Sequence, residues 1–155
     1  MSRDTNEEIF MREQLCEDLY SIRASLEKAF SYDTAHKHRL GWTPSAGHCA
    51  AVAVIVNTIL GGSLCSATVD GESHWFNRVS DGSQLYDIDL TGDQFGKKPV
   101  QIAEIGRLYA GTKLRQWFDL NADTMARAYR LAERAKLPIA VEGIERDILL
   151  FIGMK

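Results

Sequence analysis

The sequence has no cluster of lysine and arginine residues and no long hydrophobic run. Its 18 Lys and Arg residues are outnumbered by 21 Asp and Glu residues, which gives a formal net charge of −3. Proteins that bind nucleic acid or anionic membranes rely on clustered basic side chains. The longest apolar stretch, Cys49 to Leu60, is interrupted by Asn57 and Thr58 and is too short to span a bilayer. We therefore expect neither nucleic acid nor a membrane as a partner.

Cysteine is also scarce. Cys16, Cys49 and Cys65 cannot all pair with one another, and they form no C-x-x-C unit, so we expect them to be reduced. The first residues lack the apolar core of a signal peptide and carry acids where such a peptide is basic or apolar. These features predict a cytoplasmic protein.

The composition is that of an ordinary folded domain. Hydrophobic residues make up 45% of the 155-residue chain and charged residues 25%, with a mean hydropathy of −0.20. A domain of this length buries roughly 70% of its unfolded surface, so it folds without disulfides or a structural metal. Because no internal repeat or linker is visible, we expect one α+β domain over residues 1–155.

Four stretches are predicted to be helical. Apolar residues at Leu15, Leu19, Ile22 and Leu26 recur at the spacing of one helical face and predict an amphipathic helix over residues 7–30. The segment 47–60 would be apolar on nearly every side of a helix, and two glycines follow it. This pattern predicts a buried helix that ends at the glycines. A third helix is expected over 122–136, ended by Pro138, and a short one over 102–109. The tail from residue 139 has an apolar patch that the pattern does not assign.

Three short segments between the second and third helices favour a sheet. Residues 64–69, 73–79 and 84–90 are separated by the turn pairs Asp70-Gly71 and Asp81-Gly82, a pattern typical of antiparallel hairpins. The predicted architecture is a central helix packed on a small antiparallel β-meander, with flanking N- and C-terminal helices.

One set of residues in this arrangement could perform covalent chemistry. A cysteine at a helix start, here Cys49, has its thiolate stabilised by the helix dipole, and the backbone N–H groups there can hold an oxyanion. His74 on the second strand could act as the base, and Asp89 on the third could orient it. If the turn centres on Asp81-Gly82, residues whose numbers sum to about 163 pair, so His74 lies opposite Asp89. Asp87 shares the face of Asp89 and is the reserve orienting residue.

Two other interpretations compete with this triad. A buried cysteine near a helix start is usually a small hydrophobic residue with no chemical role. Zinc binding is the second alternative, because the chain has the ligand types His36, His38, His48, Cys49 and His74. These residues do not form a paired unit of the C-x-x-C or H-x-x-x-H kind, so we expect neither a metal nor a cofactor.

The motifs between residues 42 and 95 resemble the bacterial YunG family. They are Gly47-His48-Cys49 with the following Ala50 to Ala53, Leu60-Gly61-Gly62, Gly71-x-x-His74-Trp75-Phe76-Asn77-Arg78, Asp89-Leu90-Thr91 and Gln94-Phe95. More distantly, G-x-C followed by H-W-x-N and D-x-T is similar to the core of transglutaminase-like and papain-like cysteine enzymes, whose cysteine opens the central helix.

This resemblance implies a role for each matching residue. Cys49 matches the nucleophile, His74 the general base and Asp89 the orienting acid. The chain lacks the upstream glutamine of papain-like enzymes, which leaves Ser45 and the backbone N–H groups of Gly47, His48 and Cys49 for the oxyanion side of the site. The cleft would be lined by Trp42, Trp75 and Asn77.

The leading functional hypothesis is a papain- or transglutaminase-like cysteine enzyme that hydrolyses or transfers an acyl group at an amide or thioester bond of a peptide or protein. The alternative is a non-catalytic protein-binding or inhibitor module on the same fold, as a phage might encode. The apolar C-terminus leaves room for a homodimer interface.

Overall fold

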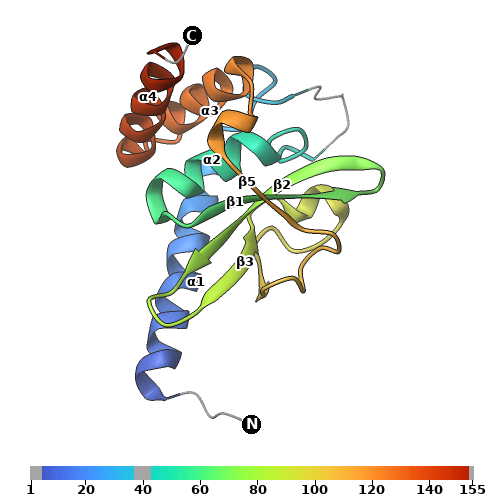
Figure 1. Ribbon diagram of the computed structural model, residues 1–155, viewed down its shortest axis with the longest axis vertical. Helices are drawn as coiled ribbons and strands as arrows, with labels where there is room; N and C mark the ends of the chain where they lie inside the picture. The colour runs from blue at the N-terminus through green and yellow to red at the C-terminus, as the bar shows by residue number, and fades with distance from the viewer. Residues whose placement is uncertain (1–4, 37–42, 154–155) are drawn as a thin grey trace.

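The computed structural model describes residues 5–36 and 43–153, in which four α-helices surround a five-stranded antiparallel sheet (Figure 1). The strand order is β4-β3-β2-β1-β5. The helices are α1 (Asn6–Glu27), α2 (Cys49–Leu60), α3 (Ala122–Arg134) and α4 (Pro138–Gly153). The strands are β1 (Ser63–Val69), β2 (Glu72–Ser80), β3 (Leu85–Asp89), β4 (Gln101–Glu104) and β5 (Lys113–Arg115), with short 3-10 helices η1 (Gly92–Phe95) and η2 (Trp117–Asp119).

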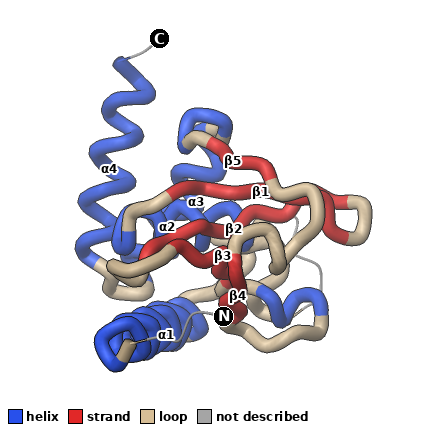
Figure 2. The backbone as a smooth tube through the Cα atoms, turned by 60° about the horizontal axis from the view of Figure 1, so that its bottom comes forward, coloured by secondary structure: helices blue, strands red, loops and turns tan. Residues whose placement is uncertain are grey.

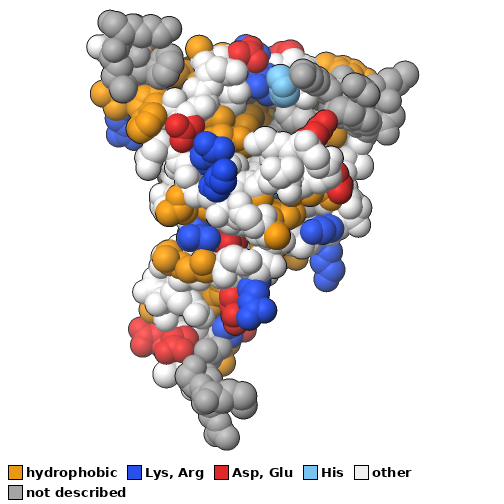
Figure 3. Space-filling view, turned by 45° about the vertical axis from the view of Figure 1, so that its right-hand side comes forward, with side chains coloured by type: hydrophobic (Ala, Val, Ile, Leu, Met, Phe, Trp, Pro, Cys, Tyr) orange, Lys and Arg blue, Asp and Glu red, His pale blue; other side chains and the backbone are white. Residues whose placement is uncertain are grey.

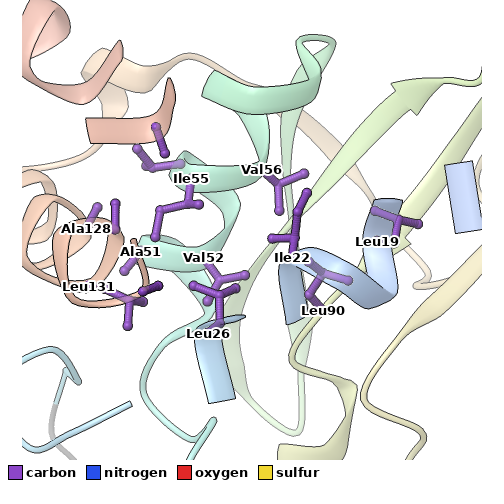
Figure 4. Close-up of a cluster of buried hydrophobic side chains, with 14 of the residues drawn as sticks. Leu19, Ile22, Leu26, Ala51, Val52, Ile55, Val56, Leu90, Ala128 and Leu131 are labelled. Carbon is purple, nitrogen blue, oxygen red and sulfur yellow. The ribbon is translucent and has the colours of Figure 1, made fainter. Parts of the chain in front are cut away.

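Helix α2 is the centre of the fold. It contacts β1 and β2 of the sheet and also both C-terminal helices, α3 and α4. Figures 1 and 2 show α2 between the sheet and these helices, with α1 beside the other end of the sheet. Apolar side chains of all four helices and of β2 and β3 meet in one cluster, part of which Figure 4 shows. The enclosure explains why α2 is apolar nearly all round, as the sequence predicted.

The β1–β2 hairpin has the predicted two-residue turn. Asp70 and Gly71 both have positive φ angles, +52° and +80°, which the favoured hairpin turn requires and which glycine adopts without strain. Val69 pairs with Glu72 across it, and Ala67 pairs with His74 further along.

The β2–β3 connection corrects the predicted register. Asp81 begins a loop that is longer than the predicted two-residue turn. Its N–H donates to the carbonyl of Gln84, and its Oδ1 accepts hydrogen bonds from the N–H groups of Ser83 and Gln84. Asn77 therefore pairs with Ile88 and Arg78 with Asp87, so the register differs by two residues from the one that places His74 opposite Asp89. Because side chains alternate with a period of two, this shift leaves His74 and Asp89 on one face.

Two further predictions were wrong. The short helix expected over 102–109 is strand β4 followed by turns, because Ile102 pairs with Ile88 and so completes the outer edge of β3. Pro138 begins α4 and does not end α3, since proline fits the first turn of a helix, where its missing N–H needs no partner. Lys136, which lies between the two helices, has φ +58°, and this left-handed conformation changes the direction of the chain there. The unassigned tail forms the rest of α4.

The surface carries no broad region of one charge on the face that Figure 3 shows, where acidic and basic side chains alternate among polar and small apolar areas. Over residues 5–36 and 43–153, no helix has the length and apolarity that crossing a bilayer requires.

Candidate active site

Cys49 is the first residue of α2, and a tight backbone contact fixes its position. The preceding Gly47 has φ +79°, and its carbonyl accepts from the N–H of His36 at 2.8 Å. A Cβ at Gly47 would lie 2.5 Å from the carbonyl oxygen of His36, so only glycine fits. The half-buried Cys49 side chain thus lies at the N-terminus of α2, which is the positive end of the helix dipole.

His74 and Asp89 are joined by a hydrogen bond. His74 Nε2 lies 2.8 Å from Asp89 Oδ2, and each residue is only 2% exposed. Because Nε2 is taken by Asp89, Nδ1 is the nitrogen left to face Cys49. Asp89 thereby holds the imidazole in one orientation, which is the role predicted for it.

Two residues for which the sequence predicted no role also bind the Asp89 carboxylate. The hydroxyl of Tyr109 donates to Oδ2 at 2.5 Å, and the N–H and hydroxyl of Thr91 donate to Oδ1 at 2.9 and 3.1 Å. The D-x-T spacing of Asp89 and Thr91 is a recognisable turn signal. Tyr109, 20 residues along in a turn, has no such local signal.

These contacts set the charges of the site. Burial opposes protonation of His74, but the hydrogen bonds and negative charges of Asp89 and Cys49 outweigh it and raise the pKa of His74 to about 9. Burial likewise opposes ionisation of Asp89, yet His74, Tyr109 and Thr91 hold the pKa of this carboxyl below its usual value. Burial, and then the nearby charges of Asp89 and Cys49, raise the pKa of Tyr109. The site therefore favours an imidazolium beside an ionised aspartate and a neutral tyrosine.

Aromatic rings enclose the imidazole of His74. Its centroid lies 4.8 Å from that of Phe95 and 5.1 Å from that of Tyr109, both edge-on, and 6.1 Å from the stacked ring of Phe76. This packing restricts the ring to one rotamer and keeps water from the His74–Asp89 bond, which strengthens the bond.

Cys49 and His74 open into one cavity of about 1040 Å³. The β1–β2 hairpin, the segment before α2 and the N-terminal part of α3 form its walls. Gly47 and Trp75 line it, as expected. The remaining walls come from His36, Thr43, Ala46, Ala50, Val69, Asp70, Glu72, Ser73, Gln94, Phe95, Asp119, Leu120, Asn121, Thr124 and Arg127.

The other predicted site residues have different partners. The Ser45 hydroxyl donates to Asp93 at 2.6 Å, and Asp93 is in turn held by Arg23. His48 is fully buried, with Nε2 at 2.7 Å from the Thr34 hydroxyl and Nδ1 at 3.2 Å from the Ala46 carbonyl. These contacts tie the segment before Cys49 to the end of α1 and to η1.

Asn77 and Asp87 are buried in structural contacts. Asn77 donates to the Ala53 carbonyl at 2.8 Å and so joins β2 to α2. Asp87 accepts from Arg78 at 2.7 Å and from the Gly106 N–H at 2.9 Å, whereas the bond to His74 comes from Asp89. Trp42 and the zinc candidate His38 lie outside the described residues.

Within the described residues, no three His, Cys, Asp or Glu side chains gather closely enough to hold a metal ion. His36 is exposed at the cavity, and His48 has the contacts given above. The thiol of Cys49, the imidazole of His74 and the carboxylate of Asp89 lie together at this site.

Comparison with known proteins identifies the family of the chain. No curated protein and no solved structure matches it. The family described as YunG protein matches residues 18–133, which is well over half of the chain and includes Cys49, His74, Asp89 and Tyr109. The chain therefore belongs to the YunG family.

Proposed function

We propose that this protein is a cysteine-nucleophile enzyme that cleaves or transfers an acyl group at an amide or thioester bond, with a papain- or transglutaminase-like arrangement of Cys49, His74 and Asp89. The supporting observation is that His74 is hydrogen-bonded to Asp89 and that Cys49 also contributes to raising the pKa of this imidazole. Nucleophile, base and orienting acid thus form one chain, as this chemistry requires.

The reaction begins with the Cys49 thiolate and the His74 imidazolium. Sγ attacks the carbonyl carbon, a C–S bond forms, and the carbonyl π electrons move to the oxygen. The N–H of His48 donates to the Ser45 carbonyl at 3.1 Å, so we assign the oxyanion to the N–H of Cys49 in the first turn of α2, where N–H groups have no helical partner. The intermediate collapses, and the leaving amine or thiolate takes the proton of His74.

The acyl group is now a thioester on Cys49, and His74 is neutral. A water molecule, or an acceptor amine for transfer, gives a proton to His74 as its oxygen or nitrogen attacks the thioester carbonyl. The C–S bond then breaks, the acid or new amide leaves, and the thiolate–imidazolium pair is restored. Asp89 stays ionised throughout and stabilises the imidazolium.

Alkylation by iodoacetamide tests the nucleophile. We would measure the rate at each cysteine by mass spectrometry between pH 5 and 10, because the thiolate fraction controls that rate. Cys49 should react fastest, and its reaction should persist well below pH 8 and slow sharply in His74→Ala. Cys65 serves as the internal control, because burial and the charge of Asp87 raise its pKa to about 11.

The opposite result would support the non-catalytic binding module. In that case Cys49 reacts slowly, titrates like a free thiol and is indifferent to His74→Ala. Labelling is also compared between the wild type and Cys49→Ala, in the peptide that contains residue 49. Equal labelling of this peptide in the two proteins would show that the reagent does not act on the Cys49 thiol.

A further inference from the structure

Arg127 lies in the wall of the cavity that holds Cys49 and is almost completely buried. Its side chain is 7% exposed. Nε donates to Asp123 at 3.0 Å and Nη2 to the Thr124 hydroxyl at 2.9 Å. Nη1 is buried and has no hydrogen-bond partner among the residues that the structure describes. Two edges of the guanidinium are thus fixed by α3, and the third is left for another group.

An unpartnered guanidinium nitrogen is costly to bury. A buried donor without an acceptor destabilises the folded state by about 1–3 kcal/mol, and more where the group is charged. Native proteins therefore seldom keep such a group unless it has a role. The guanidinium is charged at every physiological pH, so the acceptor that fits it best is an anion.

The charge of Arg127 is only weakly neutralised by the protein. Its acidic partner Asp123 is 71% exposed, so solvent screens the pair. The second buried arginine, Arg23, also has one nitrogen without a hydrogen-bond partner in the described part of the chain, its Nε, which lies 3.2 Å from Glu27. Its charge is better neutralised, because both terminal nitrogens bind the Asp93 carboxylate and Nη1 also binds the Leu90 carbonyl. The exposed acids Asp70 and Glu72 at the rim of the cavity face solvent and do not cancel a buried charge.

We propose that the Cys49 cavity takes an acyl substrate with a free carboxylate, and that this carboxylate binds the guanidinium of Arg127. A peptide or amide with a C-terminal carboxylate or an acidic side chain has the required chemistry. The inference rests on the proposed function, because it names the substrate class of the same site. Arg127 is then a specificity-determining residue, held in place by Asp123 and Thr124.

Paired alkylating probes test this inference. Chloroacetyl-glycine, chloroacetyl-β-alanine and chloroacetyl-4-aminobutyrate carry a carboxylate at increasing distance from the reactive carbon, and the corresponding primary amides are neutral. In each, Sγ of Cys49 displaces chloride. The acid-to-amide ratio of the Cys49 rates reports carboxylate binding, because the reactivity of the thiol cancels in it. Chloroacetyl-aspartate α-amide against its asparagine counterpart distinguishes an acidic side chain from a terminal carboxylate.

We expect the acid to react about tenfold faster than its amide at one length or more, as a charge-assisted hydrogen bond in a desolvated site provides. The ratio should fall to one or below in Arg127→Gln. Arg134→Gln is the matched control, since it removes the same charge from the same helix, at an exposed position away from the cavity.

A ratio near one at every length, or a preference for the acid that persists in folded Arg127→Gln, would overturn the proposal. If Arg127→Gln does not fold, Arg127→Lys decides, because a recognition role requires the retained positive charge to keep the ratio above one, and a ratio of one in folded Arg127→Lys overturns the proposal. The rates with the neutral amides report the proposed function separately. Fast, His74-dependent labelling by the amides without acid preference leaves that function intact and rejects only the carboxylate site.

Discussion

The side chains of His74 and Asp89 meet although their residues are not directly paired in the sheet. The observed register pairs Asn77 with Ile88, and its continuation places Asp89 opposite Phe76, two residues from His74. The imidazole reaches diagonally across the strands to make its 2.8 Å bond. Diagonal neighbours on one face of an antiparallel pair are close enough for long side chains to touch.

Removing the Cys49 side chain should change the titration of His74. A hydrogen bond and a negative charge from Cys49 contribute to raising the pKa of His74 to about 9, so Cys49→Ala should lower this pKa. The measurement is an NMR titration of the histidine Cε1–H signals, with Cys16→Ser as the control variant. An unchanged His74 titration in Cys49→Ala would mean that the two side chains do not interact.

Asp89 and Asp87 should differ sharply although both are buried carboxylates on one face of β3. Asp89→Asn removes the charge that holds His74, so it should lower the pKa of His74 and slow the alkylation of Cys49. Asp87→Asn breaks the bonds to Arg78 and should cost stability while the His74 titration stays in place. If Asp87→Asn moved the His74 titration as far as Asp89→Asn, Asp87 would be an orienting residue after all.

The sequence predicted the triad for a reason that was partly wrong. The pairing argument assumed a two-residue turn at Asp81-Gly82, whereas the Asp81 side chain caps a longer loop and shifts the register. His74 and Asp89 still meet because the shift is even, which preserves the face of every side chain. An odd shift would have turned Asp89 away from His74.

The contacts that the sequence could not predict are those made across the fold. Ser45 binds Asp93, which is 48 residues away, and Tyr109 reaches Asp89 from a turn that has no periodic pattern. Strand β4 forms by pairing with the outer edge of β3. Its four residues are too few to show the alternation of apolar and polar side chains by which a strand is predicted. Arg127 falls within the helix predicted over residues 122–136. Nothing in the neighbouring sequence indicates that one of its nitrogens is buried without a hydrogen-bond partner among the described residues.

Tyr109→Phe tests the support of the Asp89 carboxylate. The substitution removes one donor to a buried charge and leaves the ring packing against His74, so it should lower the free energy of unfolding by about 1.5–3 kcal/mol. Urea denaturation measures the change. Tyr20→Phe is the matched control because Tyr20 is 58% exposed, and its loss should be within about 0.5 kcal/mol. Equal effects of the two variants would show that the Tyr109 hydroxyl contributes nothing to stability.

The stability of the protein should depend on pH through His74. Its pKa is about 9 in the folded protein and has an ordinary value of 6.5, so the folded state binds the proton more tightly. The resulting stabilisation is fully present below about pH 6.5 and is lost as the pH rises through about 9. The free energy of unfolding of the wild type, relative to that of His74→Gln, should therefore decrease between pH 6.5 and pH 9. A constant or increasing difference over this range contradicts the raised pKa.

Gly47→Ala should disturb the start of α2 more than a comparable glycine replacement elsewhere. A Cβ at Gly47 would meet the His36 carbonyl, in addition to the strain of a side chain at positive φ. Gly111 is the matched control, since its φ is +71° and a Cβ there meets nothing within 4 Å. Gly47→Ala should lose about 1–3 kcal/mol more stability than Gly111→Ala, because a methyl group is forced into a packed site. It should also slow the alkylation of Cys49, which its backbone positions, whereas Gly111→Ala leaves that rate unchanged. Urea denaturation and iodoacetamide labelling of both variants measure these effects, and equal losses in the two would mean that the His36–Gly47 contact does not fix the nucleophile.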